Sequence, residues 1–133
     1  MVDYGSRANA ICITLVSQTA GNGTGNAGIR QNAAALDTAL SGLEQLVPPA
    51  TVSARYSDLL ANFKAAVELY KINLSKFIRL NNKLKANPND KTAEKQLVHL
   101  QAPISRNLQA AAKDAHSLGM GRCETAFVNP NGG

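Results

Sequence analysis

The sequence predicts an all-α protein, an up-down-up-down four-helix bundle with a long third helix and a disulfide between Cys12 and Cys123. Apolar residues recur at helical spacing in four segments, and none of these segments alternates apolar and polar residues as a strand does. Aromatic residues make up only 5% of the 133 residues and tryptophan is absent, so leucine, alanine, isoleucine and valine must build the core. Short links rich in glycine, proline or asparagine separate the segments, which favours an antiparallel bundle.

The first two predicted helices cover residues 3–18 and 28–46. In the first helix, Asp3 or Ser6 is a candidate N-cap, because a short side chain with an oxygen atom can accept hydrogen bonds from the free amides of the first turn. The second helix ends before the prolines at 48 and 49, since proline lacks an amide proton and disfavours helix in the residue before it. Its apolar side chains form one stripe: Ile29, Ala33, Leu36, Leu40, Leu43 and Val47.

The third and fourth predicted helices, residues 52–86 and 91–118, are longer than the first two. Thr51 is the candidate N-cap of the third helix. Pro103 lies inside the fourth segment and predicts either a kink there or a shortened helix that restarts near it. At the standard rise per residue the third and fourth helices are ~50 and ~40 Å long, against ~24 and ~28 Å for the first two. Their shared tip is therefore predicted to project beyond the bundle.

The only two cysteines, Cys12 and Cys123, lie near opposite ends of the chain. In an up-down-up-down bundle the fourth helix ends beside the start of the first, and residues 119–123 can reach the ~13 Å back to Cys12. The alternative is two unrelated free thiols. An even cysteine count and the reach of the chain favour the bridge, which implies an oxidising compartment.

The chain is predicted to be one domain, residues 1–133, with residues 124–133 as a flexible tail. Gly119 suits the position just past a helix C-terminus and, with Gly121, gives the backbone freedom to turn back. Met120 and Phe127 are then expected to cover the open end of the core between the first and fourth helices.

We expect the protein to be secreted or in the cell envelope. No apolar run approaches the about 18 residues that a transmembrane helix needs. Residues 1–10 hold no apolar segment long enough for a secretory signal. If the protein is exported, this chain is therefore expected to be its mature part.

Several stretches resemble small exported helical proteins and lipoproteins of actinobacteria, over nearly the whole chain. Those proteins have an alanine-rich first-helix motif that ends in cysteine, a double proline before the third helix, and a terminal leucine-glycine segment followed by cysteine. The resemblance implies an extracytoplasmic bundle with the Cys12–Cys123 bridge and no assigned activity. The chain departs from it at Asn9, where an acidic residue is expected, and in its long, basic third and fourth helices. The matching stretches are "ANAIC" at 8–12, "LVPPA" at 46–50, "RYSDLL" at 55–60 and "AHSLGMGRC" at 115–123.

Neither an enzyme nor a cofactor or metal site is predicted. "GTGNAG" at 23–28 matches the phosphate-binding pattern G-x-G-x-x-G, but a helix precedes it and no βαβ unit is available, so a flexible linker is predicted. His99 is expected opposite the apolar stripe of the fourth helix and His116 on its flank. Metal and haem sites in bundles need inward ligands from several helices, so His116 with Met120 is a weak candidate. The hydroxyl groups are scattered without an acid–base partner.

Basic residues are concentrated near the predicted tip. Residues 71–95 contain seven lysines or arginines and two acidic residues, so this segment alone has the +5 net charge of the whole chain. Leu69, Ile72 and Leu80 are predicted to point away from the main apolar stripe. Exposed apolar and basic side chains together indicate a contact surface. Its predicted residues are Leu69, Lys71, Ile72, Lys76, Arg79, Leu80, Lys83, Lys85, Lys91 and Lys95.

We therefore expect a non-catalytic protein that acts through binding or assembly. A homodimer of two hairpins accounts best for the apolar residues, and an anionic envelope component, such as lipid or acidic polymer, accounts best for the lysines. A simply solvated hairpin is the plain alternative. Nucleic acid is not an expected partner, because no aromatic residues are interleaved with the basic ones. A carrier or sensor of a small apolar ligand in the core is a further alternative, since alanines alternate there with Phe63, Tyr70 and Phe77.

Overall fold

The computed structural model describes residues 3–22 and 25–128, and this part of the chain is built from α-helices joined by short links. The all-α prediction is confirmed for these residues. They form six α-helices rather than the predicted four. The helices are α1 (Tyr4–Thr19), α2 (Asn26–Glu44), α3 (Ser53–Ile72), α4 (Leu74–Ala86), α5 (Lys91–Ser117) and α6 (Gly121–Val128), and a 3₁₀ turn, Ala50–Val52, precedes α3.

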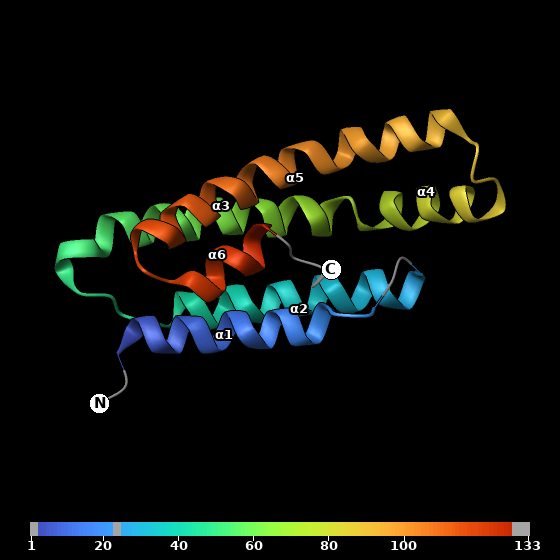
Figure 1. The fold of residues 1–133 in the computed structure, drawn as a ribbon. Coiled ribbons are helices and arrows are strands. Elements are labelled where there is room, and N and C mark those ends of the chain that lie inside the picture. The colour runs from blue at the N-terminus through green and yellow to red at the C-terminus, as the bar shows by residue number, and fades with distance from the viewer. Residues whose placement is uncertain (1–2, 23–24, 129–133) are drawn as a thin grey trace.

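Long helices run back and forth along one axis (Figure 1). The first helix, α1, runs one way and α2 returns beside it; α3 and α4 run out again nearly in line, and α5 returns along both. The short helix α6 contacts both α5 and α1. At the other end, the α4–α5 hairpin extends past the end of α1 and the start of α2 (Figure 1), which agrees with the predicted projecting tip.

The start of α1 and the link that follows it are held by side-chain hydrogen bonds. Of the two predicted N-caps, Asp3 is the one observed: its Oδ1 accepts from the Ser6 amide at 2.7 Å. This bond holds the pKa of the Asp3 carboxyl below its usual value. Asn22 donates from Nδ2 to Oδ1 of the buried Asn32 at 2.7 Å, which ties the end of the link to α2.

The predicted third helix is broken at Asn73, between α3 and α4. The Asn73 side chain donates from Nδ2 to the Leu69 carbonyl at 3.0 Å, and the Asn73 amide donates to the same oxygen at 3.1 Å. An asparagine side chain that competes for backbone groups weakens the helix around it, which a periodicity of apolar residues does not reveal. The predicted N-cap Thr51 is also wrong, because it lies inside the 3₁₀ turn and α3 begins at Ser53 without a side-chain cap.

Helix α5 continues through Pro103, so of the two predicted alternatives, a kink or a restart, the restart is wrong. It begins with Asp90 as N-cap, which accepts from the Ala93 amide at 3.0 Å. After α5 the chain turns at Gly119, whose φ is +73° as the prediction requires. The Gly119 amide donates to the His116 carbonyl and the Met120 amide to the Ala115 carbonyl. These two bonds form a Schellman motif, which satisfies carbonyls at the helix end and reverses the chain.

The predicted flexible tail is wrong for residues 124–128, which belong to α6. Residues 129–133 lie outside the described residues. The ring centroid of Phe127 lies 4.7 Å from that of Phe63 in α3, and both side chains are buried. Met120 is buried as well, so the predicted role of Met120 and Phe127 in covering the core is confirmed.

Tyr56 joins α3 to the end of α2. Its hydroxyl donates to the Leu43 carbonyl at 2.5 Å, and its ring packs edge-on against Tyr4 with centroids 5.8 Å apart. Burial, and to a smaller extent the neighbouring Tyr4, raise the pKa of the Tyr56 hydroxyl to about 12. The neutral phenol is therefore part of the folded core.

Replacing Phe127 with alanine is expected to lower the free energy of unfolding by about 3 to 5 kcal/mol, because a buried phenyl ring is lost and its cavity cannot fully close. Val128→Ala is the matched control, since Val128 is in the same helix but 65% exposed. Urea unfolding of both variants measures the difference. Equal and small effects would mean that α6 does not seal the core.

Tyr56→Phe is expected to destabilise the protein at pH 8 and to do so less as pH rises. The unfolded phenol ionises near pH 10 and the folded one near 12, so the stabilisation from burying the neutral Tyr56 is fully present below pH 10 and is lost as pH rises toward 12. Relative to Tyr56→Phe, the parent should lose about 1.4 kcal/mol of unfolding free energy by pH 11. Paired urea titrations from pH 8 to pH 11 measure this difference. A constant gap would show that the pKa is not raised.

Candidate functional site

The two cysteines form the predicted disulfide, which links α1 to α6. The Cys12 and Cys123 Sγ atoms are 2.03 Å apart, the Cα atoms are 5.0 Å apart, and 111 residues separate the two positions in sequence. Neither residue has surface exposed to solvent. The sulfur atoms therefore act as a structural link in the core and present no reactive thiol at the surface.

Polar contacts support the same junction from outside. The Arg122 amide donates to Asn9 Oδ1 at 3.2 Å, so the residue at which the chain departs from the family resemblance binds the start of α6. His116 Nδ1 lies 3.1 Å from Glu124 Oε1 and connects α5 with α6. His116 is exposed while Met120 is buried, so these two side chains do not share a haem-ligand position. Among the described residues, no group of three or more His, Cys, Asp or Glu side chains is placed to hold a metal ion.

The apolar part of the predicted contact surface is largely wrong. Leu80 is only 2% exposed, and Leu69 is half-buried against the core. Only Ile72 is freely exposed, at 78%. The reason is that α4 contacts both α5 and α2, so a wider arc of α4 is covered than one apolar stripe requires.

The basic part of the predicted surface is exposed, and most of it is unpaired. Lys71 pairs with Asp37 at 3.2 Å and Lys91 with Glu94 at 3.7 Å. The remaining predicted cations form no ion pair within residues 3–22 and 25–128, and four of them are the only charged side chains of α4. These unpaired cations are Lys76, Arg79, Lys83, Lys85 and Lys95.

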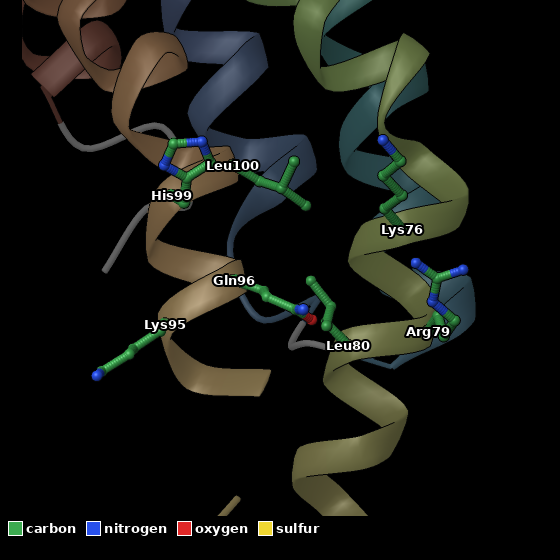
Figure 2. A pocket seen from close by; sticks show the side chains of 7 residues that line it. All are labelled: Lys76, Arg79, Leu80, Lys95, Gln96, His99 and Leu100. Atoms are coloured by element: carbon green, nitrogen blue, oxygen red, sulfur yellow. The ribbon is translucent and has the colours of Figure 1, made fainter. Parts of the chain in front are cut away.

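An open groove with a volume of about 480 Å³ lies between α4 and α5. Figure 2 shows Leu80, Gln96 and Leu100 directed into the space between the two helices, whereas Lys95 extends away from it. Its lining residues are Lys76, Arg79 and Leu80 from α4 and Lys95, Gln96, His99 and Leu100 from α5. The sequence prediction identified the α4 residues and Lys95 but missed the other three. The available signal was their spacing, because Lys95 and His99, like Gln96 and Leu100, are four residues apart and share a helix face.

Two further features of the sequence prediction are His99 and the glycine-rich motif. His99 is exposed, as its place opposite the apolar stripe predicts, although it borders this groove. Part of "GTGNAG", at 23–24, lies outside the described residues, and α2 begins at Asn26 within the motif.

Side chains at the centre of the core, including Leu43, Leu59 and Phe63, have no accessible surface. Within the described part of the chain, none of the helices combines the length and apolarity needed to cross a membrane.

Comparison with known proteins returned no family model, no characterised protein and no solved structure that matches this chain. The resemblance to exported actinobacterial proteins therefore stays a prediction.

Replacing both Cys12 and Cys123 with alanine is expected to lower the free energy of unfolding by about 4 to 5 kcal/mol, because the unfolded chain gains the freedom of a very long open loop. The melting temperature should fall by about 10 to 20 °C, while the far-ultraviolet circular dichroism spectrum stays helical. Thermal melts of the double variant and of the reduced parent measure this. If the double variant melts like the oxidised parent, the disulfide is not a structural link.

Proposed function

We propose that this protein is a non-catalytic, extracytoplasmic member of the exported helical-bundle proteins it resembles, and that its α4–α5 hairpin attaches it to an anionic lipid surface. The observation that carries the proposal is the set of four cations on α4. None of them is neutralised by a carboxylate within the described residues.

An unpaired cation on a helix surface attracts anions more strongly than one in an ion pair. Each lysine or arginine close to an anionic membrane contributes about 1 kcal/mol to binding. Four such residues on one short helix therefore contribute at most about 4 kcal/mol, which gives weak, reversible attachment that is favoured by low ionic strength. The exposed Ile72 at the end of α3 supports lipid over acidic polymer, because an apolar side chain gains free energy at the headgroup boundary of a membrane.

The disulfide supports the extracytoplasmic part of the proposal. A buried bond between Cys12 and Cys123 forms and persists in oxidising compartments and is rare in the cytosol. Envelope lipids are anionic surfaces available in such a compartment, so the location and the charge of the hairpin point to the same kind of partner.

Homodimerisation through the hairpin has less support. It depended on an outward apolar strip of Leu69, Ile72 and Leu80. Two of these three residues pack within the chain. One exposed isoleucine does not supply the apolar centre that a stable interface needs.

Replacing Lys76, Arg79, Lys83 and Lys85 together with glutamine is expected to reduce cosedimentation with vesicles that contain phosphatidylglycerol by more than about ten-fold. The matched control replaces Lys64, Arg106, Lys113 and Arg122 with glutamine, which removes the same charge outside α4 and away from the tip of the hairpin. Binding of the parent should also fall between about 0.05 and 0.5 M salt, because the Debye length shortens.

Three outcomes would contradict this function. The first is failure of the parent to sediment with anionic vesicles, and the second is equal sedimentation with vesicles of phosphatidylcholine alone. The third is an equal loss of binding in the control variant and the hairpin variant, which would show that net charge alone decides. Binding to polyphosphate without binding to vesicles would assign the hairpin to an acidic polymer instead.

A further inference from the structure

We propose that the groove between α4 and α5 is a binding site for a single anionic amphiphile: Lys76 and Arg79 hold its phosphate group, and Leu80 and Leu100 contact the first carbons of its hydrocarbon chain. The inference rests on the proposed function and deepens it, because it assigns a stoichiometric site within a surface that otherwise attracts anions only diffusely.

The α4 side of the groove supplies the charge. Lys76 and Arg79 are three residues apart, so they share one face of the helix. Neither has an ion-pair partner in the described part of the chain. Two neighbouring cations repel each other, and an anion between them adds two attractions over shorter distances that outweigh this repulsion. The planar arginine fork also matches two oxygens of one phosphate.

The α5 side supplies hydrogen-bonding groups. Gln96 directs its side chain into the space between the helices, and the His99 ring stands at the edge beside Leu100 (Figure 2). An amide group and an imidazole ring can both donate to phosphate oxygens. The ammonium group of Lys95 extends away from the groove, so it adds to the local field without closing the site (Figure 2).

The floor of the groove explains why the ligand should carry hydrocarbon. Leu80 is 2% exposed and Leu100 is half-buried, and neither offers a hydrogen bond. The volume of about 480 Å³ is in the range of sites for small organic molecules and exceeds what one phosphate ion fills. A bare anion would leave the exposed part of Leu100 in contact with water, whereas an attached chain would cover it.

The other two cations of α4 separate this site from general attraction. Lys83 and Lys85 belong to the same exposed helix, but they do not line the groove. Their replacement changes the charge of the hairpin as much as replacement of Lys76 and Arg79. A built site loses affinity when Lys76 and Arg79 are replaced, and loses much less when Lys83 and Lys85 are replaced.

The test is titration of the full, oxidised protein with dihexanoyl phosphatidic acid below its micelle concentration, followed by amide NMR shifts and calorimetry. We expect saturable binding of one molecule, with shifts centred on Arg79, Gln96 and Leu100. Lys76→Gln with Arg79→Gln should weaken binding by more than about ten-fold. Lys83→Gln with Lys85→Gln should weaken it by less than about three-fold.

A second pair of variants tests the floor. Leu100→Asp places a carboxylate in the groove and should abolish binding, whereas Gln101→Asp makes the adjacent, exposed position one charge more negative and should retain it. Circular dichroism verifies that each variant is folded. If Leu100→Asp does not fold, the glutamine variants of the preceding titration decide alone.

Two ligand controls identify the chemistry. Dihexanoyl phosphatidylcholine should bind much more weakly because its headgroup has no net charge, and inorganic phosphate should bind more weakly because it lacks the chain. Three results would overturn the assigned site. They are binding of either control as tight as that of dihexanoyl phosphatidic acid, equal losses of affinity in the two double glutamine variants, and NMR shifts that do not saturate. If vesicle attachment persists in that case, the proposed function stands and only the groove is wrong.

Discussion

The bond between Cys12 and Cys123 is the constraint on which the rest of the arrangement depends. It holds α6 on α1, and because only the Gly119 turn separates α6 from α5, it also places the end of α5 beside the start of α1. The chain therefore closes covalently at one end, where Phe127 and Met120 complete the core. The opposite end has no such closure. There α4 and α5 continue past the end of α1 and the start of α2, as Figure 1 shows.

The two ends also differ in charge. Ion pairs occur at both: His116 with Glu124 and Arg55 with Asp114 at the closed end, and Lys91 with Glu94 near the tip. At the projecting end, α4 carries only cations, which cost little because water surrounds them on their outer side. Phe77 and Leu80 still fix α4 to the rest of the protein through its inner side. A hairpin anchored in this way can present unpaired cations without losing its fold, which a free helix of that charge could not do.

Much of the fold, but little of the site, could be predicted from the sequence. Apolar periodicity located α1, α2 and α5 within about two residues of their ends, because each presents one stripe to the core. It failed at Asn73, where a side chain competes with the helix. It also failed for α6, because that helix is only eight residues long and is held by a disulfide and buried rings rather than by its own propensity. Leu80, Gln96 and His99 were misplaced or missed because a single-helix pattern does not show which neighbour covers a given face.

The groove follows from the same geometry. Leu80 and Leu100 lie between the two helices, and the groove beside them is also lined by the exposed Lys76, Arg79 and His99. Water keeps the repulsion between the two cations small, and neither has an ion-pair partner among the described residues. Salt screens these charges diffusely, whereas one phosphate bound between them would add two attractions at a fixed place.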